Sequence, residues 1–257
     1  MDDPANKYLF KSKVVGKNGN ADAATVRMLG AHVSGLPTMF AMYEHKEAAL
    51  APSSEALLAA YGSLAYPPGS CYEYSNVGFA ALSAIASNLT GMEIGPLMTQ
   101  RVLTPLGLDD GFFGLNVAHL STGAKRYDSW GNPIPDYTTT TPASGESYAS
   151  AHDVARFAMF NMKRHDRARI LDDHWIEELH KPVFAGPSGV ATTFGWFTGH
   201  LKSGIQIIFK IGGQPGVATA LYMIPSEDLA CLVLTNRCDG SELMFQGVQR
   251  NPLQLLA

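Results

Sequence analysis

"PPGSCYEYSNVGFAALSAIASNLTG", residues 67–91, sets a proline-glycine turn directly before a long apolar run. Apolar residues recur at helical spacing and a terminal glycine follows them, so the stretch predicts a helix over 76–90. Ser75 and Asn76 are residue types that cap a helix N-terminus, because their oxygens accept unpaired backbone N–H groups. Capping does not account for the phenol of Tyr74. The role of Tyr74 is therefore left open by the helix pattern alone.

Helical patterns surround this stretch on both sides. Each is bounded by residue types that favour helix ends, and the last begins with the capping-box pair Ser150 and Asp153. The segment before this last helix, 111–149, is rich in Gly, Thr, Ser and Pro and predicts a long loop region. The other predicted helices are 25–35, which ends at Gly35, 53–64, which is capped by Ser53 or Ser54, and 96–104, which ends near Pro105.

Short β-rich runs replace the helical pattern from about residue 194 onward. Strands are predicted near 204–211, 217–224 and 229–236, joined by the hairpin segments "GGQPG" and "PSED", and a helix is predicted from Ser241. A helical middle followed by an antiparallel sheet indicates the α+β class. We expect one domain over 1–257, mainly helices and loops to about residue 190 and then sheet strands with a C-terminal helix.

The overall composition excludes several classes of protein. A formal net charge of −4 over 257 residues provides no basic surface for nucleic acid. The chain contains no apolar stretch long enough to cross a bilayer, and "MDDPANKYLF" has none of the features of a signal peptide. The three cysteines show neither a disulfide framework nor metal-ligand spacing. Because the sequence also has no glycine-rich phosphate loop or nucleotide fingerprint, we expect no cofactor.

Three histidines need separate interpretation. His174 and His180 have no acidic partner at metalloprotease spacing, so both are expected on the surface of a helix. His32 lies at a predicted helix end and is expected to pack or cap locally.

Several stretches together resemble one family, which comprises the serine β-lactamases, the penicillin-binding proteins and related esterases, especially the class C β-lactamase branch. Residues 67–91 are similar to its Pro-Gly turn, Tyr-x-Asn motif and following helix, and "KIGGQPGVATALYMIP" at 210–225 is similar to its Lys-Thr-Gly strand and hairpin. Further similar stretches, in the same order as in the family, are "VRMLGAHVSGLP", "RVLTPLGLDD" and "ASGESYASAHDVARF". The resemblance implies a β-lactamase/transpeptidase-like fold, in which helices pack on an antiparallel sheet beside a mainly helical subdomain.

The resemblance also implies a catalytic pair. Tyr74 would exchange a proton with a nucleophilic serine, and Lys210 would be a cation beside it. A free phenol has a pKa of about 10, so ionising it at neutral pH costs roughly 4 kcal/mol, and a nearby cation lowers that cost.

Three further residues would bind the substrate. By resemblance, Asn76 would hold a substrate amide or carbonyl, and the small residues Gly212 and Gly213 would let a substrate lie against the strand edge. The backbone N–H of Gly213 would be one donor of an oxyanion hole. Ile211 lacks the hydroxyl that many relatives use for a substrate carboxylate.

The family's nucleophile is the serine of a Ser-x-x-Lys motif, and none of the serines in this sequence has a lysine three residues later. The first residues, "MDDPANKYLF", resemble the family segment that follows the nucleophile's helix. We therefore expect that the nucleophile helix and the first sheet strands are absent from this chain. The true N-terminus is an open question at this point, and so is the cellular compartment.

The leading interpretation is the body of a serine hydrolase for acyl transfer on ester, amide or β-lactam substrates, inactive without its Ser-x-x-Lys segment. One alternative is a non-catalytic binding or scaffold protein of the same fold. The other is an enzyme that uses Tyr74 and Lys210 for acid–base chemistry without a serine. Because the predicted strands are apolar on both faces, we expect the sheet to pair with a second copy or with an N-terminal partner chain.

Overall fold

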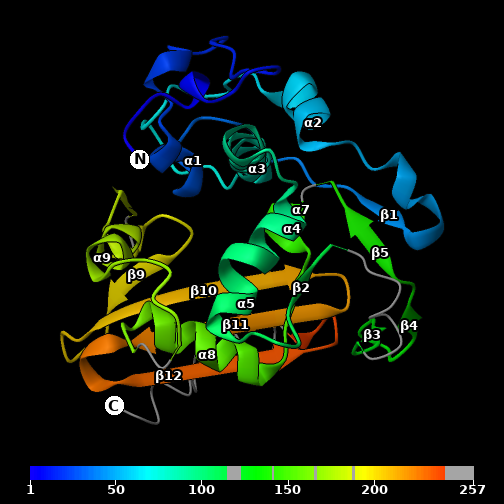
Figure 1. The fold of residues 1–257 in the computed structure, drawn as a ribbon, viewed down its shortest axis with the longest axis vertical. Coiled ribbons are helices and arrows are strands. Elements are labelled where there is room, and N and C mark those ends of the chain that lie inside the picture. Colours follow the sequence, from blue (N-terminus) through cyan, green and yellow to red (C-terminus); the bar gives the residue numbers. More distant parts are fainter. Residues whose placement is uncertain (115–122, 141, 165–166, 187–188, 241–257) are drawn as a thin grey trace.

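The computed structural model describes residues 1–114, 123–140, 142–164, 167–186 and 189–240 (Figure 1). The predicted helix after Ser241 lies outside these residues. Figure 1 shows a helical part around α1, α2 and α3 and a sheet part around β10, β11 and β12, with α4, α5 and α8 drawn across the sheet. The predicted α+β, β-lactamase/transpeptidase-like architecture is confirmed.

The helical part is built from short helices around one longer helix. The longest is α3, Asn76–Thr90, and the others are α1 (Val26–Gly30), α2 (Ser54–Tyr61), α4 (Ile94–Met98), α5 (Thr104–Leu106), α7 (Pro142–Gly145), α8 (Ala151–Asn161) and α9 (Asp173–His180). A π-helical turn, Thr99–Leu103, joins α4 to α5, and 3-10 turns cover Ala5–Lys7, Ala21–Ala23, His45–Leu50 and Pro225–Glu227. A buried core formed by α1, α3 and the N-terminal segment contains Leu9, Leu29, Val77 and Ala81.

The main sheet has six antiparallel strands in the order β12-β11-β10-β9-β8-β7. Its strands are β7 (Phe184–Ala185), β8 (Ala191–Thr192), β9 (Phe197–His200), β10 (Gln206–Gln214), β11 (Val217–Ile224) and β12 (Leu229–Thr235). Ala158 and Met162, at the C-terminal end of α8, pack with Ile208, Leu221 and Met223 on one face of this sheet. Ile207, Ile224, Phe209 and Tyr222 form a second apolar cluster.

The three predicted hairpin strands and three of the predicted helices are confirmed. Ser75 caps α3 and Gly91 ends it in the left-handed conformation, while Ser53 caps α2. The capping box of α8 is present, with both Ser150 and Asp153 in their expected roles.

One predicted helix end was wrong. The first helix ends at Gly30 rather than Gly35, because His32 adopts a positive φ of 58° and the backbone carbonyls at 32 and 33 accept the N–H groups of residues 73 and 69. The helical path after Pro96 ends at Leu106, next to Pro105, as predicted.

The region predicted as a long loop contains short strands and one helical turn. The strands are β2 (Phe112–Phe113), β3 (Arg126–Tyr127), β4 (Pro133–Ile134), β5 (Tyr137–Thr139) and β6 (Ser147–Tyr148), and β1 (Met42–Glu44) pairs with β5. Strands of two or three residues are too short to produce a period in the sequence. Strands β7 and β8 were not predicted for the same reason, and β9, with four residues, is hardly longer.

Candidate active site

Tyr74 is placed by the cap of the helix that follows it. The Ser75 hydroxyl accepts a hydrogen bond from the Gly78 N–H at 2.9 Å and donates one to the Pro37 carbonyl at 2.9 Å. The Thr38 hydroxyl donates to the carbonyl of Tyr74 itself. These bonds hold the backbone at Tyr74 against the 37–38 segment, while 38% of the Tyr74 residue surface is exposed.

His32 makes a second set of contacts with the same segment. Its Nδ1 accepts the Ser75 N–H at 3.1 Å, and its ring stacks on the Tyr74 ring with centroids 4.1 Å apart. Burial, with a smaller contribution from the charge of Lys210, lowers the pKa of His32 to about 3. The sequence indicated only local packing or capping for this residue, although "HVSGLP" was among the stretches that carried the resemblance.

Lys210 reaches the tyrosine from the sheet. Side chains alternate along β10, so Lys210 lies on the same face as Ile208, which packs with α8. Its Nζ lies 5.4 Å from the centroid of the Tyr74 ring and 5.2 Å from that of the Phe197 ring. The structure thus brings together two of the predicted residues from distant parts of the chain. Phe197, on β9, was not predicted.

The pKa values in this cluster are set mainly by burial. Burial lowers the pKa of Lys210 to about 8 and raises that of Tyr74 above its ordinary value. At neutral pH the lysine is therefore mostly protonated and the phenol is neutral. The expected lowering of the phenol pKa by a nearby cation does not outweigh burial in this arrangement.

The other predicted residues lie at the start of α3 and the end of β10. Asn76 is the first residue of α3 and is about nine-tenths buried. A Cβ on Gly212 would lie 2.6 Å from the Thr219 hydroxyl, whereas a Cβ on Gly213 would have no heavy atom within 4 Å. Strand β10 pairs with β9 only over Gln206–Phe209, so its later residues present an edge beside Lys210.

Gln214 anchors this end of β10. Its Nε2 donates to the Gly145 carbonyl at 2.6 Å, and its Oε1 accepts from the Tyr137 hydroxyl at 3.1 Å. The same hydroxyl lies 2.9 Å from the Pro215 carbonyl. The strand segment that contains Gly213 is thereby tied to α7 and β5.

A family model described as beta-lactamase matches residues 1–247. The chain belongs to the beta-lactamase family.

Individual relatives are distant. This beta-lactamase family protein is 25% identical to Unguisins hydrolase ungD' of Aspergillus campestris, over 91% of this chain and 46% of that protein. The chain spans about half the length of the curated relatives it matches.

Solved structures share the fold. A penicillin-binding protein from Bacillus halodurans has a TM-score of 0.75 and 17% identity, over 97% of this chain and 76% of that one. A class C beta-lactamase has a TM-score of 0.75 and 15% identity, over 92% of this chain and 70% of that one.

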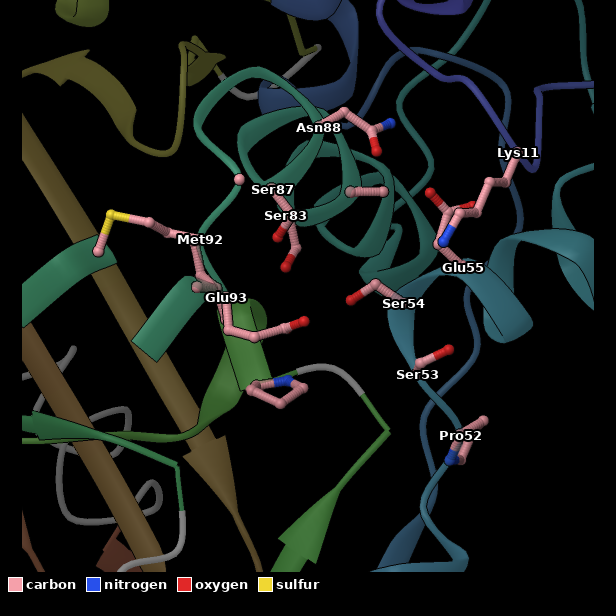
Figure 2. A pocket seen from close by; sticks show the side chains of 14 residues that line it. Lys11, Pro52, Ser53, Ser54, Glu55, Ser83, Ser87, Asn88, Met92 and Glu93 are labelled. Atoms are coloured by element: carbon pink, nitrogen blue, oxygen red, sulfur yellow. The ribbon is translucent and has the colours of Figure 1, made fainter. Parts of the chain in front are cut away.

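A separate cavity of about 340 Å³ lies among α2, α3 and the start of α4 (Figure 2). Figure 2 shows Ser83 of α3 and Glu93, just before α4, projecting into it. Within the described residues its lining contains none of the five predicted site residues. In this beta-lactamase family protein the Tyr74–Lys210 cluster therefore lies outside the cavity.

The described part of the chain has neither a metal-binding cluster nor a single membrane-spanning helix. It contains no group of three or more His, Cys, Asp or Glu side chains placed to hold a metal ion. Nor does it contain a single helix long and apolar enough to cross a membrane; α3 with 94–106 meets the length and composition criteria only as a pair bent by 75°.

The predictions for the two helical histidines differ in outcome. His174 is exposed as expected, but His180 is buried with its ring edge against Trp196, so its predicted surface position was wrong.

Proposed function

We propose that residues 1–257 form the substrate-binding and proton-transfer site of a hydrolase that transfers acyl groups from ester, amide or β-lactam substrates. The observation that carries the proposal is the 5.4 Å approach of the Lys210 ammonium to the Tyr74 ring. A phenol and a cation from distant segments meet at an exposed strand edge inside a chain of the beta-lactamase family.

Each residue of the cluster has a defined part in this proposal. Tyr74 acts as a phenolate, formed when the phenol releases its proton to solvent; it accepts the proton of the attacking serine hydroxyl and then gives that proton to the leaving group, which restores the phenolate. Lys210, positively charged at neutral pH, stabilises this phenolate. The Gly213 N–H faces the developing oxyanion, and the Asn76 amide holds the acyl side of the substrate.

The proposal needs a nucleophile that these 257 residues do not supply through a Ser-x-x-Lys motif. We propose that such a serine comes from sequence outside these residues or from a second chain. The curated relatives support this possibility, because the matched part accounts for 46% and 47% of their lengths.

A second candidate function is reversible binding of a small molecule at the same site. It is favoured by the lack of a Ser-x-x-Lys motif and by the raised pKa of Tyr74, since a less acidic phenol ionises less readily. Acid–base chemistry by Tyr74 and Lys210 without a serine is a further alternative.

The test adds a Ser-x-x-Lys segment from a relative to this chain, fused or in trans. We expect fluorophosphonate labelling and small-ester hydrolysis to begin, and Tyr74→Phe to reduce turnover by roughly 10²–10⁴. Tyr72→Phe is the matched control, because Tyr72 is equally exposed, at 38%, and is two residues away.

We expect the control to change turnover by less than about threefold, because Tyr72 has no part in the proposed proton transfer. Equal turnover in the parent and in Tyr74→Phe would contradict the hydrolase proposal. Tight reversible binding without labelling would favour the binding function instead.

A further inference from the structure

His32 combines three features that packing alone does not require. It is 3% exposed, its φ of 58° is uncommon for a residue other than glycine, and it lies just beyond the end of α1. Its carbonyl accepts the Glu73 N–H at 2.9 Å and its Nδ1 accepts the Ser75 N–H at 3.1 Å. The two bonds bracket Tyr74 on either side along the chain.

The imidazole ring also fixes the phenol. His32 and Tyr74 stack with their planes 25° apart, while Phe79 lies 5.2 Å from the imidazole on centroids and Tyr72 meets it edge-on at 6.2 Å. His32 therefore holds both the backbone on either side of Tyr74 and the Tyr74 ring itself. A displacement of about 1 Å in a reacting group is enough to cost about 10²-fold in rate.

The acceptor role determines the protonation state of the ring. An imidazole nitrogen that accepts a hydrogen bond carries no proton, so the hydrogen of neutral His32 is on Nε2. Nε2 is buried without a hydrogen-bond partner among the described residues. Protonating Nδ1 would break the Ser75 bond and place a second positive charge near Lys210.

We propose that His32 is a positioning residue for Tyr74: a permanently neutral imidazole that brackets the tyrosine backbone and stacks on its ring, so that the phenol stays beside Lys210. The inference rests on the proposed function for its catalytic consequence, but the positioning itself is a property of residues 1–257. The titratable groups that face the ring are Lys210 of β10 and the phenols of Tyr72 and Tyr74.

The first experiment is NMR on residues 1–257 with ¹⁵N-labelled histidine. We expect His32 to show an unprotonated Nδ1 and a protonated Nε2, unchanged from about pH 8 to about pH 5, whereas an ordinary histidine titrates near pH 6.5. A proton on Nδ1, or titration of His32 near pH 6.5, would overturn the proposal.

Two variants separate the hydrogen bond to Nδ1 of His32 from the stacking of its ring on Tyr74. His32→Asn keeps a side-chain acceptor near the Nδ1 position and tolerates positive φ, but it loses the stack. His32→Phe keeps a ring and loses the acceptor. Each should shift the Tyr74 ring signals in ¹³C-tyrosine spectra, and His174→Asn should leave them unchanged; unshifted signals in a folded His32→Asn protein would contradict the positioning role.

The catalytic consequence is measured in the enzyme supplied with a Ser-x-x-Lys segment. His32→Asn should lower kcat by about 10- to 100-fold with KM changed less than about threefold, because the phenol is displaced while the binding groups stay in place. An unchanged kcat with shifted Tyr74 signals would overturn the catalytic consequence. If the parent shows no activity at all, the proposed function fails, whereas the NMR result still decides the positioning.

Discussion

Replacing Lys210 with methionine should stabilise the fold at neutral pH while removing the cation that the proposed chemistry needs. Burial lowers the pKa of Lys210 from 10.5 to about 8. Each pKa unit corresponds to about 1.4 kcal/mol, so keeping the lysine charged in the folded protein at pH 7 costs up to about 3 kcal/mol. Contacts of the ammonium with the Tyr74 and Phe197 rings offset about 0.5–2 kcal/mol of this. We expect Lys210→Met to raise the free energy of unfolding by about 1–3 kcal/mol at pH 7.

The stability gain of Lys210→Met should become smaller as the pH rises. The lysine has a lower pKa in the folded state than in the unfolded state, so between about pH 8 and pH 10.5 the folded protein has lost a proton that the unfolded chain retains. The stability of the parent protein therefore rises through this window relative to the variant. The advantage of Lys210→Met should shrink by about 2 kcal/mol between about pH 7 and pH 9.5.

Urea unfolding of both proteins at the two pH values measures this difference. Lys202→Met is the matched control, because Lys202 is exposed in the turn before β10 and should change stability by less than about 0.5 kcal/mol at either pH. A Lys210→Met protein that is less stable than the parent at pH 7, or an advantage that does not vary with pH, would refute the reasoning.

Three other predictions concern the helix cap, acylation and assembly. Ser75→Ala should cost about 2–3 kcal/mol of unfolding free energy, because it removes the cap of α3 and leaves the Pro37 carbonyl without its donor. The control Ser53→Ala removes only a cap on α2 and should cost about 1 kcal/mol. Equal losses of the two variants in thermal unfolding would contradict a contribution from the Pro37 bond. Residues 1–257 alone should form no acyl-enzyme, since they contain no Ser-x-x-Lys motif; a stoichiometric adduct on any serine in mass spectrometry would overturn this. The chain alone should dimerise, bind a partner or precipitate through its apolar sheet. Light scattering that shows a monodisperse, cooperatively melting monomer would contradict this prediction.

Local chemistry explains what the sequence predicted well. The cap Ser75, the apolar period of α3 and the glycine after it all lie within one short stretch, so the helix is specified by neighbouring residues. The hairpins of β10, β11 and β12 are likewise adjacent in the chain. Tyr74 and Lys210 were selected because the segments around them resemble a family.

Tertiary contacts explain what the sequence did not predict. Strand β1 pairs with β5, which lies far along the chain, and neither has the length to show a period. The end of α1 depends on the left-handed His32, whose partners are residues 73–75. His180 is buried because Trp196 of the sheet region packs on it. Such contacts exist only after distant segments have met.

The coupling between Tyr74 and Lys210 tests the central claim most directly. The measurement is a double-mutant cycle of Tyr74→Phe and Lys210→Met on the turnover of a small ester by this chain supplied with a Ser-x-x-Lys segment. If the lysine acts by stabilising the tyrosine's phenolate, the double variant should lose no more activity than the worse single variant. Losses that multiply, as they do for independent residues, would contradict the account.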